Sequence, residues 1–322
     1  MTVAVGLEQK VRAFGGTEGL HMLRFTIGLM IGIFWVTVAA ADPAADLIAG
    51  TRQECRGCDL RGVSFKKADL SGVDLTEADL SGVSFHRAIL REAVLTGATA
   101  KGTNFNLVDA TRARFDGSDL SGALFYEAQL SGADLSGANL TEARLQTARL
   151  TAASLAGARL QNTLARDTAL NNADLSGIVA IGANLSGAQL RGSNLTGAIF
   201  TASRLDQANA ARADFTDVQA TQTDFQQADL RGADFAGAAL TSNRFLRAQV
   251  EANTFDGATM VTNIMVNGEA LDNPGDVYAR SERTDTVNNR QDFTPAVNIN
   301  NPDGVAVTIT VSYPSSSNVN PD

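Results

Sequence analysis

The sequence predicts an all-β fold, a solenoid in which the chain winds through stacked coils of short parallel strands. Three observations support this prediction. Apolar residues fall on every fifth position from Leu60 to Met260 without an insertion, and 33 of these 41 central positions are Leu or Phe. Between residues 58 and 262, all 18 glycines lie two positions after such a central residue, and all 11 phenylalanines lie on a central position. No proline occurs between Pro43 and Pro274.

A period of five residues fits neither a helix nor a flat strand, which repeat every 3.6 and 2 residues, nor a coiled coil. It fits a short extended stretch followed by a tight turn. The central residue and the small residue two positions before it would fill a narrow interior. Glycine after the centre suits a corner with positive φ. A proline inside the repeat would remove a hydrogen bond to a neighbouring coil.

The clearest repeats, such as LSGADLSGANL at residues 130–140, resemble the A-(D/N)-L-x-x motif of the pentapeptide-repeat family. The resemblance covers 41 consecutive units at residues 58–262. It implies a right-handed, quadrilateral parallel β-helix with four units per coil and about ten coils. Residues 20 apart then stack into an internal core ladder. Its expected members are Phe65, Phe85, Phe105 and Phe125 in one column, continued by Phe225 and Phe245, then Phe215, Phe235 and Phe255 in a second column, and Leu135.

Residues 1–41 precede the repeat and predict an export leader. Arg24 comes before an apolar run at residues 25–40, and three alanines end the leader before Asp42. A basic start, an apolar core and an A-x-A end are typical of a secretory signal peptide. We expect cleavage between Ala41 and Asp42, with Met1 or Met22 as the true start. The protein is then exported, periplasmic or extracellular, without stable membrane insertion. An uncleaved leader would instead anchor it in a membrane, although the run is short for a full span.

Residues 42–57 are expected to cap the first coil, with a short helix over residues 43–51. Cys55 and Cys58 follow this helix. The pair could form a redox motif, half of a metal site or a structural disulfide. Asp59 stands where a haem attachment site needs His, and a redox pair precedes a helix rather than follows one. Both cysteines fall on inward positions, and export permits oxidation. We favour a disulfide that closes the N-terminal end, with two free buried thiols as the alternative.

Residues 263–322 form a polar tail in which the five-residue phase is lost. Apolar and polar residues alternate from Val305 to Tyr313, next to a Pro-Asp-Gly turn at residues 302–304. This pattern predicts a β-hairpin over residues 297–313. The hairpin is expected either to cap the last coil or to offer an edge to another chain.

No catalytic, cofactor-binding or metal-binding residue is predicted. The chain has two histidines, and His86, the one within the repeat, falls on an outward position. Motifs for nucleophilic catalysis, zinc or phosphate binding are absent from the sequence. The many aspartates before central leucines recur once per side, so we interpret them as solvated or turn-bonding side chains rather than calcium ligands. An enzyme is therefore not expected.

Two classes of function are left. The first is a non-catalytic exported structural scaffold or protein-interaction rod with an unknown protein partner. The second is implied by the family resemblance, because some pentapeptide-repeat proteins mimic duplex DNA and inhibit DNA gyrase or topoisomerase. The leader argues against this alternative, as does a net charge of only −4 in the repeats, from 22 acidic and 18 basic residues. The net charge of −9 for the whole chain also excludes a general nucleic-acid binder.

Overall fold

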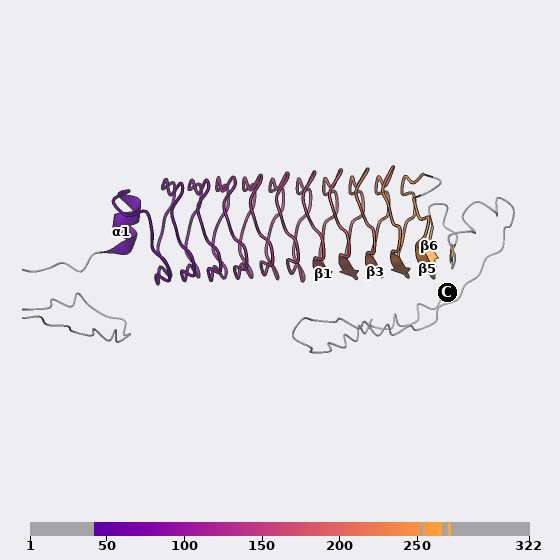
Figure 1. Cartoon of the computed structure of the whole chain (residues 1–322), viewed down its shortest axis with the longest axis horizontal. Coiled ribbons are helices and arrows are strands. Elements are labelled where there is room, and N and C mark those ends of the chain that lie inside the picture. The colour runs from indigo at the N-terminus through magenta and orange to yellow at the C-terminus, as the bar shows by residue number, and fades with distance from the viewer. Residues whose placement is uncertain (1–41, 252–253, 266–269, 272–322) are drawn as a thin grey trace, which may run out of the picture. The chain divides into compact units, whose positions relative to one another are not determined.

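The computed structural model describes residues 42–251, 254–265 and 270–271, all within the first of two compact units, Met1–Val277. These residues form a parallel β-solenoid of stacked coils (Figure 1), as the sequence predicts. The expected leader at residues 1–41 and the expected hairpin at residues 297–313 lie outside the described residues.

Helix α1, Pro43–Ile48, opens the described chain. Asp42 is its N-cap, and its side-chain oxygen accepts a hydrogen bond of 3.0 Å from the N–H of Ala44. A capping carboxylate followed by a proline in the first turn is a favoured start for a helix. Leu47 is buried and joins the hydrophobic core of the coils. The helix ends before residue 51, the predicted end, and is followed by Gly50 with φ of 69°.

The coils are held together by parallel pairing between equivalent positions of successive coils. The pairs run from Glu54 with Asp74 to Arg244 with Ile264. Within a unit, the central N–H donates to a carbonyl of the next coil, as Leu75 does to Val94 over 2.7 Å. Because the spacing between paired residues equals four of the repeated units, each coil has four sides. The pairing begins at Glu54, so the last residues of the predicted cap at 42–57 already belong to the first coil.

One side of the solenoid carries longer strands than the other three. The five strands are β1 (Val179–Ile181), β2 (Ile199–Thr201), β3 (Gln219–Thr221), β4 (Ala239–Thr241) and β5 (Thr259–Val261). They form one parallel sheet in chain order. A short antiparallel pair, β6 (Asn263–Ile264) with β7 (Ala270–Leu271), follows at the C-terminal end of the described coils.

The core ladder lies inside the coils. Leu135 is fully buried, and the phenylalanines of both columns are at most 5% exposed. Most rings at the same position in successive coils stack face to face, with centroids 4.5 Å apart for Phe215 and Phe235 and 4.8 Å apart for Phe105 and Phe125. Phe235 and Phe255 are instead tilted by 44°. Rings of the two columns meet edge-on, as Phe215 and Phe225 do at 80°. Phe115, which lies on the same side as Phe215, meets Phe105 at 87°. Both arrangements are favourable for aromatic pairs, and together they fill the interior.

The corner two positions after each centre has positive φ at every described unit from Gly57 to Thr262. Glycine is the residue that tolerates this conformation without strain. The structure extends the predicted glycine corner to many positions that are not glycine, including Leu107 and Thr147 with φ of 58° and 57°. The ladder of hydrogen bonds therefore imposes the corner, whatever side chain stands there.

Candidate interaction surface

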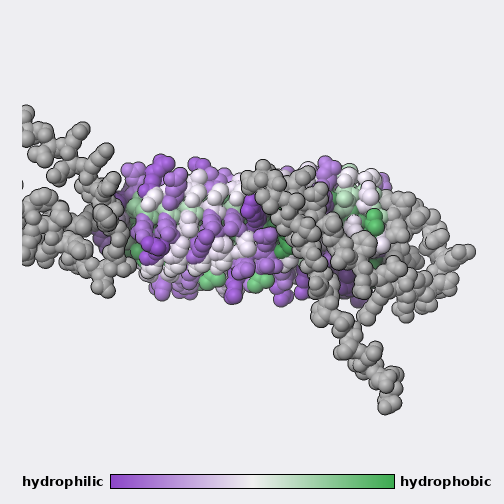
Figure 2. All heavy atoms as spheres, turned by 90° about the horizontal axis from the view of Figure 1, so that it is seen from below, coloured by the Kyte–Doolittle hydropathy of each residue, from purple (hydrophilic) through white to green (hydrophobic). Residues whose placement is uncertain are grey.

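The interior is filled by the central residue of each unit and the small residue two positions before it. The surface therefore consists of the three other residues of the unit, which lie one position before, one position after and two positions after the central residue. Stacking of the coils repeats these positions in columns, with neighbouring strands ~4.8 Å apart. Hydrophilic side chains dominate the face seen in Figure 2, and hydrophobic ones are scattered among them. The chemistry of each column follows from which residues the sequence places at the same position of successive coils.

Aspartate or asparagine before a centre closes the corner. The Asp134 carboxylate accepts hydrogen bonds from the N–H and the hydroxyl of Ser136, over 3.0 and 2.6 Å. Asn194 does the same for Thr196, at 3.0 and 2.7 Å. This is an Asx-turn, in which a short polar side chain satisfies the backbone two residues later. The turn-bonding interpretation of these aspartates is confirmed at such corners.

The same hydrogen bonds lower several carboxyl pKa values. The Arg61 guanidinium and backbone N–H lower the pKa of Asp59 to about 2. The hydroxyl of Thr76 lowers the pKa of Asp74. At Asp109, partial burial raises the pKa, but hydrogen bonds from Thr111 and Arg91 outweigh it and the net pKa is lowered. These carboxylates are therefore charged throughout the neutral range.

Ion pairs join neighbouring coils. Arg91 pairs with Asp109 at 2.6 Å, and Lys101 pairs with Asp119 at 3.1 Å. The Arg91 and Lys101 side chains are 61% and 59% exposed. An exposed pair of this kind contributes about 0–1 kcal/mol, so the ion pairs order the surface more than they stabilise the fold.

A buried polar ladder, which was not expected from the sequence, lies beneath strands β1 to β5. Elsewhere the N–H three positions after a centre donates to the central carbonyl, as Ala138 does to Leu135. On this side it donates to a side chain of the next coil. The N–H of Thr223 reaches Asn243 Oδ1 at 2.8 Å, and the N–H of Asn243 reaches Asn263 Oδ1 at 2.8 Å.

The amide groups of the same asparagines return a hydrogen bond to the coil before. Asn243 Nδ2 donates to the carbonyl of Ala220, and Asn263 Nδ2 to that of Leu240, both at 2.8 Å. Ser203 Oγ similarly donates to the carbonyl of Ala180. Hydrogen bonds to side chains thus replace the backbone hydrogen bond to the central carbonyl that forms the turn elsewhere. The strands on this side are accordingly longer. The available signal was the run of serine, threonine and asparagine at inward positions where alanine is usual.

The residues that flank the centres of strands β1 to β5 carry no charge. From β1 to β5 the positions flanking the centres are Val179 and Ile181, Ile199 and Thr201, Gln219 and Thr221, Ala239 and Thr241, and Thr259 and Val261. None of them is an aspartate or asparagine able to form the Asx-turn. This side therefore presents an uncharged sheet along β1 to β5, whereas its earlier coils carry charged residues such as Asp119 and Arg159 in the same column.

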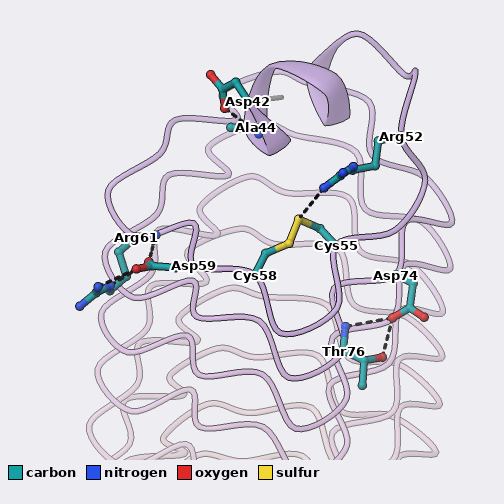
Figure 3. The surroundings of a disulfide bond; sticks show 9 residues. All are labelled: Asp42, Ala44, Arg52, Cys55, Cys58, Asp59, Arg61, Asp74 and Thr76. Carbon is teal, nitrogen blue, oxygen red and sulfur yellow. Dashed lines mark hydrogen bonds and ion pairs between the residues drawn. A yellow bond between two sulfur atoms is a disulfide. The ribbon is translucent and has the colours of Figure 1, made fainter. Parts of the chain in front are cut away.

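A disulfide joins Cys55 and Cys58 at the N-terminal end (Figure 3), with Cα atoms 5.4 Å apart. Cys55 is buried, whereas Cys58 is only partly buried, although both were expected to face inward. Arg52 Nη1 approaches the Cys55 sulfur at 3.8 Å. The N–H of Cys55 donates to the carbonyl of Asp74, so the cystine is tied to the following coil.

His86 lies half-buried at its outward position. Within the described ranges, no group of three or more His, Cys, Asp or Glu side chains is arranged to hold a metal ion. A search of those same residues finds no helix that combines the length and apolarity needed to cross a bilayer.

The fold and the corner chemistry define a class of protein: a parallel β-solenoid with a five-residue unit. The family model described as pentapeptide repeats matches residues 54–91, 88–125, 128–164, 163–197, 198–237 and 221–251. These matches cover more than half of the chain. The chain belongs to the pentapeptide-repeat family, and the match indicates no enzyme family.

Solved structures of the same family are similar to this chain. One is HetL, a pentapeptide repeat protein involved in heterocyst differentiation regulation from the cyanobacterium Nostoc sp. strain PCC 7120. It is 29% identical, with a TM-score of 0.49, and the alignment covers 69% of this chain and 95% of that chain. Another is full-length QnrB1, a plasmid-mediated fluoroquinolone resistance protein, which is 22% identical with a TM-score of 0.24 over 57% and 83% of the two chains. No curated protein matches the sequence.

Proposed function

We propose that this protein is a non-catalytic exported rod that acts as a structural scaffold or binds other proteins through its sides. The observation that carries the proposal is the filled interior. Phenylalanine, leucine and alanine occupy most of the inward positions from residue 60 to residue 245, almost without exposed area. The outward columns are the part of the coils that can contact a partner. The proposal includes the expected right-handed sense and about ten coils.

Export is supported by the position of the first element in the described residues, helix α1. Asp42 is the N-cap of helix α1 and also the first residue after the expected cleavage point. Cleavage after Ala41 would therefore keep the capped helix and the Cys55–Cys58 disulfide intact. A disulfide is favoured in an oxidising compartment, which is where an exported protein resides.

Fractionation of the native host and N-terminal sequencing test this proposal. We expect a mature protein that begins at Asp42 in the periplasmic or extracellular fraction. A chain that begins at Met1 or Met22 in the membrane fraction would show an anchored protein instead. Full-length protein in the soluble cytoplasm would contradict export. Pull-down of the mature protein should recover an envelope or extracellular protein.

A supercoiling assay separates the rod from the DNA-mimicking alternative. The mature protein is expected to leave DNA gyrase activity unchanged at equimolar concentration, because its repeats bear many arginines as well as aspartates. Inhibition at a stoichiometric concentration, together with a cytoplasmic location, would favour the inhibitor and contradict our proposal.

A further inference from the structure

One side of the solenoid carries aromatic, aliphatic and basic residues on three successive coils. We name this set the Tyr–Arg patch; its members are Leu124, Tyr126, Arg144, Gln146, Leu164 and Arg166. In the ladder, Leu124 pairs with Arg144 and Arg144 pairs with Leu164. The residues two positions later, Tyr126, Gln146 and Arg166, form the adjoining column. Neighbouring rows are ~4.8 Å apart and the two columns ~7 Å apart.

The patch holds large apolar side chains that the fold does not bury. Tyr126 is 48% exposed and Leu164 is 37% exposed. The other large hydrophobic residues this exposed among those the structure describes, Ile48, Val261 and Ile264, lie at the two ends of the coils. Tyr126 and Leu164 instead lie in middle coils, where the central residues are covered by the coils on both sides. Their exposure is therefore not a consequence of an open end.

The charges of the patch are also unusual for this protein. Arg144 and Arg166 are exposed, and neither forms an ion pair with any residue in the described part of the chain. The six members of the patch include two arginines and no acidic residue, whereas the whole chain has a net charge of −9. The corner column beside the patch contains two acids, Glu127 and Asp167. The side-chain hydrogen bond and charge of Glu127 raise the pKa of the Tyr126 hydroxyl. The patch is thus a locally basic area on an acidic molecule.

We propose that the Tyr–Arg patch binds an extended acidic segment of a partner protein, and this inference rests on the proposed role of the rod in protein binding. Tyrosine and arginine dominate the energetics of protein interfaces, and arginine binds carboxylates through two parallel hydrogen bonds. Arg144 and Arg166 lie diagonally, ~8 Å apart from the row and column spacings. Carboxylates at alternate positions of an extended chain are separated by ~7 Å. The partner segment therefore carries acid-x-acid spacing, with apolar side chains that pack on Tyr126 and Leu164.

The proposal is tested by fluorescence anisotropy on the full-length protein with three labelled probes. The first is a 12-residue peptide, ~40 Å when extended, with aspartate at alternate positions and leucine and phenylalanine at its ends. The second replaces each aspartate by asparagine, and the third is a single-stranded oligonucleotide of equal charge. We expect the acidic peptide to bind at least tenfold more tightly than either of the other two.

Two double variants supply the matched control. R144E with R166E should weaken binding of the acidic peptide at least tenfold. R149E with R159E makes the same change in charge in the same part of the rod, but on other sides, and should change the affinity less than twofold. Tyr126→Ala should weaken binding at least fivefold. All of these residues except Tyr126 are exposed arginines, so circular dichroism should show an unchanged fold.

Three outcomes would overturn the proposal: absence of binding to the acidic peptide, equal weakening by both double variants, or tighter binding of the oligonucleotide. Equal weakening would reveal general electrostatic attraction, and the oligonucleotide result would indicate a nucleic-acid surface. None of them alters the location or the N-terminus of the mature protein. Failure of the patch is therefore distinguishable from failure of the exported rod.

Discussion

The corner is where a single residue has the largest effect on the backbone. Left-handed φ at a residue with a Cβ atom costs roughly 1–2 kcal/mol, and the solenoid accepts this cost at many corners that are not glycine. Leu107 and Thr147 show that neither a bulky nor a β-branched side chain prevents it. The hydrogen bonds to both neighbouring coils must therefore outweigh the local strain.

Gly187→Ala tests this strain. A Cβ atom at Gly187 would contact Asp167 Oδ1, whereas one at Gly177 would have open space around it. Both positions have positive φ, so we expect Gly177→Ala to lower the free energy of unfolding by about 1 kcal/mol and Gly187→Ala to lower it further. Urea unfolding of the two variants measures the difference. Equal losses would show that Asp167 simply rotates away.

The Asx-turn predicts a second effect at this scale. Asp134→Ala removes the acceptor for the Ser136 N–H and hydroxyl and should lower the free energy of unfolding by about 1 kcal/mol. Asp134→Asn keeps a side-chain oxygen at the same place and should preserve most of the stability. Chemical denaturation of both proteins checks this, and an asparagine variant as unstable as the alanine variant would exclude a turn-capping role.

At the scale of a strand, the buried asparagines decide how one side of the solenoid is built. Asn243→Ala leaves the N–H of Thr223 and the carbonyl of Ala220 without their side-chain partner. We expect a loss of about 2–4 kcal/mol, because each buried unsatisfied group costs about 1–3 kcal/mol. The measurement is the midpoint of thermal unfolding.

Ser118→Ala is the control for the asparagine variant. Ser118 occupies an equivalent inward position, but its backbone N–H already donates to the carbonyl of Phe115, the group that its hydroxyl also contacts. Loss of the Ser118 hydroxyl should change the free energy of unfolding by less than about 1 kcal/mol. Similar losses in the two variants would mean that the ladder contributes no more than ordinary packing.

The cystine belongs to the first coil and its helix. We expect mass spectrometry of exported protein to find no alkylatable thiol before reduction and two after it. Cys58→Ala should lower the stability by about 2 kcal/mol, the value for a short closed loop in the chain-entropy account. Two alkylatable thiols in protein never exposed to reductant would contradict a disulfide in the native protein.

Across the whole molecule, the lowered carboxyl pKa values set the response to acid. The pKa values of Asp74, Asp109 and Asp119 lie below the ordinary 3.8 in the folded protein, so these groups favour folding when they are charged. Their contribution is present above about pH 4 and is lost as the pH falls through the folded pKa values. The urea midpoint should be constant from about pH 7 to 5 and should fall below about pH 4.

A triple variant with asparagine at residues 74, 109 and 119 is the control for acid sensitivity. Asparagine keeps a hydrogen-bond acceptor at each corner but does not titrate. The urea midpoint of the triple variant should therefore fall less steeply below about pH 4. An identical decline in the variant would assign the acid sensitivity to other groups.

The parts of this fold that the sequence predicted are those with a strict period. Leu135 and the phenylalanine columns could be predicted because inward positions recur in every unit and stack in every coil. The corner at Leu107 could not, since leucine by itself disfavours positive φ and only the completed ladder imposes it. The ladder of Asn243 and Asn263 was also missed, because each turn on that side depends on a side chain from the following coil.

The constant spacing between paired residues has a genetic consequence. Removal or duplication of one whole coil keeps every central residue and every Asx corner on its own side of the solenoid. A change by a number of units that is not a multiple of four keeps the inward pattern but moves each later column to a different side. A change that is not a multiple of five residues shifts outward residues, many of them charged, onto inward positions. Lengthening of this gene by recombination is therefore tolerated best in steps of one whole coil, so the reach of the protein can evolve without redesign of its core.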